Sequence, residues 1–324
     1  MKAITQDTYG AADVLELRDI EEPVVREGDV LVRVHAAGVG PDVWHIMTGK
    51  PYMARPALGL RRPRIPVRGW DVAGTVESVG EGVTEFRPGD EVMGVAEQGS
   101  FAERAVTAAE KLVRKPARLT FEQAAAVPVS GVTAIQALRD KAEVRPGQSV
   151  LVVGAGGGVG TFAVQIAKAL GAEVTGVAST SKLDLVRSIG ADDVIDYTRA
   201  DFADGSRAWD VIVDTAGRRP LRRLRRALMP KGTLVVVGGD GGGAWTGGFF
   251  RGMLRGPLVS MFVGQRLGAI NSKVTKEDLE AVAELIEAGA VTPVVGRTYP
   301  LREAPEAVRV LATGHAEGKL VIAI

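Results

Sequence analysis

The feature that most constrains the fold of this chain is a run of glycines between a predicted strand and a predicted helix. The apolar residues 150–153 lead into Gly154-Ala155-Gly156-Gly157-Gly158-Val159-Gly160, and apolar side chains then recur at helical spacing as far as Leu170. Glycine allows the backbone to turn sharply and to approach a ligand closely, and the start of a helix offers unpaired N–H groups and the positive end of its dipole. The glycines fit a G-x-x-G-x-x-G spacing in place of the stricter G-x-G-x-x-G. This order of elements predicts the pyrophosphate-binding turn of a βαβ unit.

The chain beyond this turn continues to alternate between two periodicities. Short apolar runs predict strands, and apolar residues three or four apart predict helices between them. The predicted strands are 149–153, 173–178, 193–196, 211–213 and 234–237, and the predicted helices are 159–170, 183–189, 221–228 and a last one that follows a Thr275 cap and ends at Gly289. Such an alternation predicts a parallel sheet that helices cover on both faces.

The first third of the chain is built differently. Predicted strands at 30–35, 71–79 and 91–95 are separated by closely spaced turn signals, which favours a compact β-barrel-like domain. Thr120 and Gln123 then form a predicted capping box that begins an alanine-rich helix. The strand-like tail 319–324 has no helix after it, so we expect it to return to the first domain. The predicted fold class is α/β, with a β-barrel domain and a doubly wound parallel-sheet domain.

Composition narrows the possible functions. The 40 basic and 39 acidic residues give a net charge of +1, which argues against nucleic acid as the main partner. The absence of cysteine excludes disulfides, thiol catalysis and cysteine-bound zinc. The first residues lack the apolar core of a signal peptide, and no run of ~18 apolar residues occurs, so we expect a cytoplasmic protein without a membrane span.

Six arginines crowd into nine residues, at positions 218, 219, 222, 223, 225 and 226. Leu221, Leu224 and Leu228 would face the sheet and leave the arginines outward. Two interpretations stay open: a solvated helix face, or a surface that binds RNA or another polyanion.

The end of the second strand of the parallel sheet predicts the choice of cofactor. A 2′-hydroxyl usually meets an acidic residue there, whereas a 2′-phosphate is repelled by one. This chain has Ser179-Thr180-Ser181-Lys182, with no acid before Asp184. Hydroxyls and an ammonium suit a phosphate, so we expect NADPH, with Ser179 and Lys182 at its phosphate and Tyr197 beside its adenine ribose.

Three motifs together carry a family likeness. Gly69-Trp70-Asp71-Val72-Ala73-Gly74, Phe86-Arg87-Pro88-Gly89-Asp90-Glu91-Val92 and Gly154–Gly160 resemble, in that order, the medium-chain dehydrogenase/reductase superfamily, and within it the zinc-free NADPH:quinone oxidoreductase (zeta-crystallin-like) branch. The resemblance implies a GroES-like domain at 1–120, completed by 290–324, and a Rossmann domain at 121–289. It also implies a homodimer formed through the edge of the Rossmann sheet.

The resemblance also suggests the reaction. Zinc-bearing relatives use a cysteine and a His-Glu pair, and this chain has Trp70-Asp71 where that pair would stand, so we expect no metal. Without a Lewis acid, the acceptors that remain for hydride from NADPH are quinones and α,β-unsaturated carbonyls. An enoyl or alkenal reductase and a zinc-free alcohol dehydrogenase are alternatives within the superfamily. A non-catalytic NADPH-binding redox sensor is an alternative of another class, because Gly40 replaces an asparagine that relatives often carry.

The candidate site residues fall into three groups. Tyr52 and His45 are the catalytic candidates. Tyr52 either donates a hydrogen bond to the reduced oxygen or packs on the nicotinamide, and His45 either donates a proton or has a structural role. The resemblance and the motifs together imply cofactor contacts at Thr133, Gly156, Gly157, Gly158, Val159, Ser179, Lys182, Tyr197, Ala216, Gly217, Gly238, Gly239, Phe262, Val263 and Gly264. The apolar wall for a flat acceptor would be Trp44, Trp70, Phe249 and Phe250. The glycine-rich segment Gly238–Gly256 reads either as an irregular loop or as an apolar lid.

Overall fold

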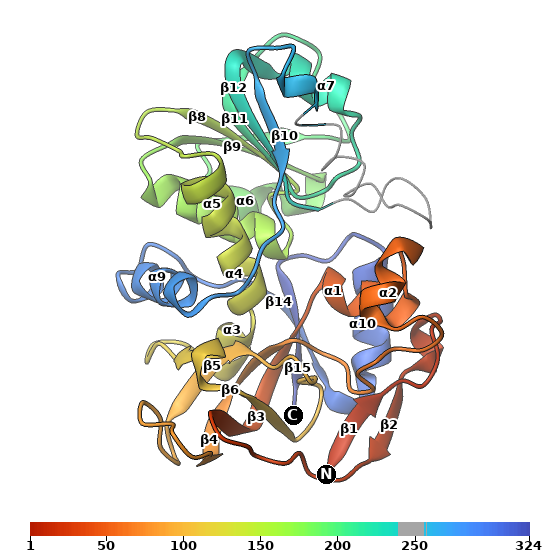
Figure 1. Cartoon of the computed structure of the whole chain (residues 1–324). Coiled ribbons are helices and arrows are strands. Elements are labelled where there is room, and N and C mark those ends of the chain that lie inside the picture. Colours follow the sequence, from red (N-terminus) through yellow and green to blue (C-terminus); the bar gives the residue numbers. More distant parts are fainter. Residues whose placement is uncertain (239–255, 257) are drawn as a thin grey trace. The chain divides into compact units, whose positions relative to one another are not determined.

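The computed structural model describes residues 1–238, 256 and 258–324 (Figure 1). The chain divides into two compact units. Unit 1 comprises Met1–Val132, Val274–Glu287 and Pro293–Ile324, and unit 2 comprises Thr133–Lys273 and Ala288–Thr292. No helix in the described part of the chain is both long and apolar enough to cross a lipid bilayer.

Unit 2 contains a six-stranded sheet in the order β10-β9-β8-β11-β12-β13, with every neighbouring pair parallel. Its strands are β8 (Ser149–Val153), β9 (Glu173–Ala178), β10 (Asp193–Asp196), β11 (Trp209–Asp214), β12 (Leu228–Val236) and β13 (Arg266–Ala269). The connecting helices include α5 (Gly158–Ala169), α6 (Leu183–Ser188) and α7 (Leu221–Arg226). The predicted parallel alternation is therefore confirmed.

The predicted helix at 221–228 ends earlier than expected. Helix α7 stops at Arg226, and Leu228 is the first residue of β12. Leu224 and Leu228 are nonetheless both buried in the cluster that packs between helices and sheet, with Leu221 partly buried against it. The periodicity found the inward positions correctly, because a leucine at the start of the next strand can meet the same core.

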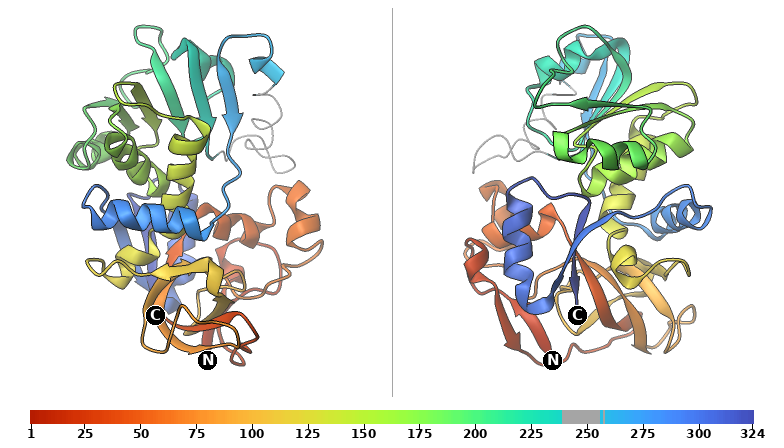
Figure 2. Two further views of the ribbon diagram at one scale, coloured as in Figure 1. Left: turned by 60° about the vertical axis from the view of Figure 1, so that its left-hand side comes forward. Right: turned by 180° about the vertical axis from the view of Figure 1, so that it is seen from behind.

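Unit 1 is built around a second sheet in the order β14-β15-β3-β4-β5-β7, with β6 also paired to β3 and a separate pair β1-β2. Its strands are β1 (Lys2–Thr5), β2 (Glu16–Asp19), β3 (Asp29–Val39), β4 (Asp71–Val79), β5 (Glu91–Val95), β6 (Arg104–Ala108), β7 (Leu112–Arg114), β14 (Val295–Pro300) and β15 (Lys319–Ala323). Strand β15 pairs antiparallel with β3 and parallel with β14, so the chain's last strand does return to the N-terminal sheet (Figures 1 and 2).

The helices assigned to unit 1 are α1 (Pro41–Thr48), α2 (Arg55–Leu58), α3 (Phe121–Ala125), α9 (Lys276–Glu287) and α10 (Ala304–Ala312), and α4 (Pro128–Ile135) begins in it. The predicted capping box of α3 is present, with both Thr120 and Gln123 bonding reciprocally. The expected boundary of the Rossmann domain at residue 289 would put helix α9 in that domain, but the structure assigns the helix to the other unit. It belongs to unit 1, because Ala117 N–H donates to Glu287 at 3.0 Å and Arg118 donates to the Ile286 carbonyl at 3.0 Å.

Candidate cofactor and active site

The carboxyl ends of the parallel strands in unit 2 bring most of the predicted cofactor residues to one edge of the sheet. β8, β9, β10 and β11 end at Val153, Ala178, Asp196 and Asp214 in matched register. The segments that follow them are Gly154–Gly160, Ser179–Lys182, Tyr197 and, after Thr215, Ala216-Gly217. Ligands of open parallel sheets bind at this edge, where the loops emerge.

The glycine turn is shaped by close approaches that exclude side chains. Gly154 adopts φ +83°, and a Cβ on Gly160 would lie 2.1 Å from the Gly154 carbonyl oxygen. A Cβ on Gly156 would lie 2.8 Å from Cδ of Lys182, so this glycine leaves room for the lysine stem. Helix α5 begins at Gly158, and no described side chain caps it. Its first N–H groups therefore suit the oxygens of a pyrophosphate.

The segments that follow β9 and β10 carry hydroxyls, one lysine and one carboxylate. Ser179 Oγ lies 3.3 Å from Ser181 Oγ, and Lys182 ends the short 3-10 helix Thr180–Lys182. Tyr197 follows β10 and is exposed. Sequence reasoning missed Asp196, which accepts hydrogen bonds from Thr180 Oγ1 at 2.5 Å and Thr198 Oγ1 at 2.7 Å. These bonds hold the pKa of Asp196 below its usual range, so this carboxylate keeps its negative charge to a lower pH.

A buried aspartate fixes the next turn along the edge. Asp214 is 1% exposed and accepts from the N–H groups of Ala216 at 3.1 Å and Gly217 at 2.9 Å. Burial raises the pKa of Asp214, while those two hydrogen bonds oppose the rise. Sequence reasoning singled out the turn and missed its anchor. The sequence pattern that could have revealed Asp214 is an acidic residue at the end of an apolar strand, shortly before small residues.

Two further cofactor candidates, Gly238 and Thr133, lie on other parts of the chain. Gly238 comes after β12, and a Cβ there would lie 2.8 Å from the Thr215 carbonyl oxygen. Thr133 is buried within α4. Gly239, Phe249 and Phe250 lie outside the described residues, as does most of the predicted lid segment.

Phe262, Val263 and Gly264 are not brought to this edge. They precede β13, whose carboxyl end is at Ala269, and a Cβ on Gly264 would lie 2.8 Å from the Pro230 carbonyl near the start of β12. They therefore lie at the amino ends of the strands. The residues that follow β13 begin at Ile270, whose N–H donates to Val236 at 3.0 Å.

The catalytic candidates lie together in unit 1. Trp44 and Tyr52 line a pocket of about 500 Å³, together with Tyr9, Lys50 and Arg55 among others. The Arg55 guanidinium lies 4.6 Å from the ring centre of both Tyr52 and Tyr9. Trp70, which directly precedes β4, is absent from the residues that line this pocket.

His45 contacts the backbone of the loop that leads to Tyr52. Its Nδ1 lies 2.9 Å from the Lys50 carbonyl oxygen, and its ring meets Trp44 edge-on. A carbonyl only accepts, so Nδ1 carries a proton and donates in this bond. The bond ties the His45 ring to the loop before Tyr52, which supports a positioning role for His45.

A buried ion pair in unit 1 involves Asp71, the second residue of the Trp70-Asp71 pair singled out in the sequence. Lys319 Nζ lies 2.7 Å from Asp71 Oδ2, with the two side chains 3% and 2% exposed, and it donates to Ser130 Oγ at 3.2 Å. Asp71 Oδ1 accepts from the Val129 N–H at 2.8 Å. This arrangement pairs an acid with a base, and no group of three or more His, Asp or Glu placed to share a metal occurs in the described part of the chain.

Asp42 adds a second carboxyl group to this region and explains Gly40. A Cβ on Gly40 would lie 2.2 Å from Asp42 Oδ1 and 3.3 Å from Lys319 Nζ. Desolvation raises the pKa of Asp42 to about 6, against the attraction of the Lys319 charge. The space that a side chain at position 40 would need is therefore taken by the Asp42 carboxyl group.

Comparisons with known proteins agree with this arrangement. The family model described as "Alcohol dehydrogenase GroES-like domain" matches residues 26–117, and the one described as "Zinc-binding dehydrogenase" matches residues 189–322. The quinone oxidoreductase of Mus musculus is 34% identical, over 99% of this chain and 97% of its own length.

Two solved structures are similar over nearly the whole chain. The quinone oxidoreductase from Coxiella burnetii has a TM-score of 0.87 at 29% identity and covers 100% of this chain and 99% of its own. The CurK enoyl reductase has a TM-score of 0.87 at 25% identity and covers 99% of this chain and 98% of its own. The GroES-like domain and the parallel Rossmann-like sheet agree with these relatives, and the lack of cysteine is consistent with the zinc-free branch. The chain therefore belongs to the quinone oxidoreductase-like, zeta-crystallin-like branch of the medium-chain dehydrogenase/reductase superfamily.

Proposed function

We propose that this protein is an NADPH-dependent, zinc-independent reductase that acts on a quinone or an α,β-unsaturated carbonyl. When bound, NADPH supplies a hydride from its nicotinamide ring. The observation that carries the proposal is the placement of Lys182 against Gly156, beside Ser179 and the uncapped start of α5. A cation, hydroxyls and free amides then meet at the edge where a phosphorylated dinucleotide would bind.

Each part of this edge has a separate task in the proposal. The amides at Gly157, Gly158 and Val159 bind the diphosphate, and Lys182 with Ser179 binds the 2′-phosphate. Tyr197 packs beside the adenine ribose. Asp214 orients the Ala216-Gly217 turn toward the rest of the cofactor, and Thr133 and Gly238 complete the contacts. Phe262, Val263 and Gly264 are left out of the proposed site because they lie at the other edge of the sheet.

The proposed acceptor site is in unit 1. Tyr52 donates a hydrogen bond to the oxygen that gains negative charge during reduction, and His45 holds the Lys50 carbonyl and so positions the loop before Tyr52. Trp44 offers a flat apolar wall. Trp70 and the aromatic residues beyond 238 stay candidates for the same wall.

An enoyl reductase is the second candidate function. The likeness to the CurK enoyl reductase favours it, because the fold and the residues described so far suit either acceptor.

The cytoplasmic location of the protein stays a prediction.

Calorimetric titration and steady-state turnover test the proposal together. We expect tighter binding of NADPH than of NADH, and loss of nicotinamide absorbance with 1,4-benzoquinone or 9,10-phenanthrenequinone. Turnover restricted to an enoyl thioester would select the second candidate. Tight NADPH binding without turnover of any acceptor would instead indicate a redox sensor, and preference for NADH would refute the proposed cofactor.

The variant K182M sharpens this test. We expect it to weaken NADPH binding about 10-fold and to leave NADH binding nearly unchanged, since a hydrogen bond to a charged group contributes about 1.5–3 kcal/mol and this site is partly exposed. K231M removes the same charge from the strand β12, away from this edge, and serves as the control. Equal losses in the two variants would show a general effect of charge.

A further inference from the structure

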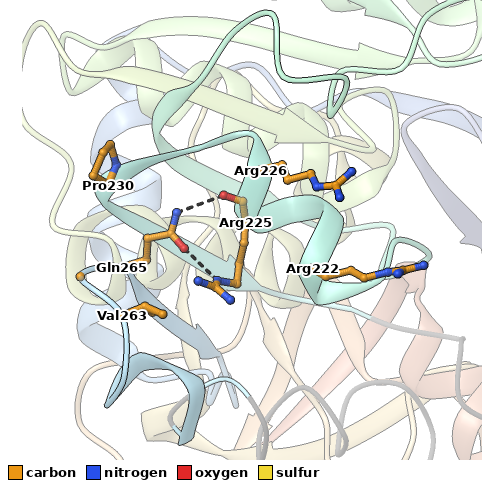
Figure 3. Close-up of a pocket in the computed structure, with 7 residues that line it drawn as sticks. Arg222, Arg225, Arg226, Pro230, Val263 and Gln265 are labelled. Carbon is orange, nitrogen blue, oxygen red and sulfur yellow. Dashed lines mark hydrogen bonds between the residues drawn. The ribbon is translucent and has the colours of Figure 1, made fainter.

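A second concave site lies in unit 2, at the opposite edge of the sheet from the proposed cofactor contacts. Its volume is about 410 Å³, and it is lined by Arg222, Arg225, Arg226, Pro230, Val263, Gly264 and Gln265 (Figure 3). Pro230 is near the start of β12, and Val263 to Gln265 directly precede β13. The pocket is therefore built by α7 and the amino ends of two strands.

The two faces of the arginine run differ in charge compensation. Arg219 and Arg223 both pair with Asp201, the former at 2.7 Å. Arg222, Arg225 and Arg226 have no carboxylate partner among the residues that the structure describes. Like charges spaced three or four residues apart destabilise a helix. The pocket face therefore concentrates positive charge, which a bound anion would offset.

The central arginine of the pocket is held in place by a buried glutamine. Gln265 is 9% exposed, and its Nε2 donates to the carbonyls of Arg225 at 3.0 Å and Leu228 at 3.1 Å. This fixes its Oε1, which accepts from Arg225 Nε at 2.9 Å (Figure 3). The bond uses one of the three guanidinium nitrogens, so Arg225 is oriented before any ligand arrives.

The chemistry of the pocket selects phosphate. Guanidinium groups bind phosphate oxygens through paired, directional hydrogen bonds, and three of them suit a ligand with more than one phosphate group. The volume lies in the range of small-molecule sites, and Pro230 and Val263 add apolar surface. We propose that this pocket binds a small ligand that carries two or more phosphate groups, at a site separate from the cofactor contacts.

Calorimetry with inorganic tripolyphosphate as the probe tests this proposal, in the presence and absence of saturating NADPH and at low and moderate salt. We expect one site per chain, which NADPH does not abolish. The double variant R222Q/R226Q should weaken binding at least about 10-fold, because each arginine contributes hydrogen bonds to a charged group. R218Q is the control, since Arg218 belongs to the same run and does not line the pocket.

Each other outcome has a definite meaning. Displacement of tripolyphosphate by NADPH would place it at the cofactor contacts, and an equal loss in R218Q would indicate a diffuse basic surface; either result overturns the proposal. Tighter binding of a single-stranded RNA, with equal dependence on Arg218, would do the same. A change of molecular mass in R222Q/R226Q would assign the arginines to a contact between subunits. Unchanged thermal melting of the double variant would confirm that it is folded.

Discussion

At the scale of single residues, Asp42 shows how one side chain can take over a neighbour's space. Its carboxyl group occupies the position that a side chain on residue 40 would need, beside the buried Lys319–Asp71 pair. The charge of Lys319 then acts on two carboxyl groups, that of its partner Asp71 and that of Asp42. The pKa of Asp42 rises to about 6, and desolvation of its carboxyl group is the main cause.

This raised pKa predicts a pH-dependent effect of the variant D42N. Between about pH 4 and pH 6 the folded protein holds a proton on Asp42 that the unfolded chain has released, so the free energy of unfolding falls as the pH rises through this range. Asparagine cannot ionise. We expect D42N to be more stable than the wild type by about 1–3 kcal/mol above pH 6, and equally stable near pH 4.

Chemical denaturation of both proteins across this pH range measures the difference. D184N is the control, because it removes a fully exposed carboxylate and changes the total charge equally. A constant difference between D42N and wild type at all pH values would contradict the raised pKa.

At the scale of elements, the glycine turn combines two requirements that the sequence motif cannot separate. Gly160 packs against the carbonyl of Gly154, whereas a Cβ on Gly157 would find its nearest described neighbour at 3.5 Å, an ordinary contact. Gly157 also has an extended backbone at φ −96°, which alanine adopts readily. Gly160 is therefore needed for packing, whereas packing does not require Gly157, which in the proposed site allows the ligand to approach.

The variants G160A and G157A should separate these roles. We expect G160A to lower the free energy of unfolding by about 1–3 kcal/mol through overpacking, with a matching fall in melting temperature. We expect G157A to melt close to the wild type and to bind NADPH more weakly in calorimetry. Equal stability of the two variants would contradict the assignment.

The sequence predicted local elements well and contacts between distant elements poorly. Periodicity and caps located β9, the β8–α5 turn and the capping box of α3, because these depend on residues close in sequence. The strand β15 was correctly expected to return to the first sheet. Phe262 to Gly264 were grouped with the other cofactor candidates but lie at the opposite edge of the sheet, which the sequence did not reveal because it depends on where β13 begins. Asp196, Asp214 and the Asp42 cluster were missed, because their partners lie on other elements.

At the scale of the whole molecule, unit 2 offers a surface that suits a second copy of the chain. Strand β13 is at the end of the sheet and pairs only with β12 among the described strands. Just before it, Leu258, Met261 and Phe262 are 59%, 76% and 85% exposed. An open strand edge beside exposed apolar side chains is a typical interaction surface. We propose that the expected homodimer forms here, edge to edge through β13.

Light scattering coupled to gel filtration tests this assembly. We expect the wild type to elute at twice the 34.0-kDa mass of the chain, and the variant F262E to shift toward the monomer, because it places charge within an apolar contact. L60E is the control, since Leu60 is 71% exposed on unit 1 and lies outside the proposed interface. A monomeric wild type would refute the dimer. A dimer that persists in F262E and dissociates in L60E would move the interface from β13 to unit 1, where the Tyr52 pocket lies.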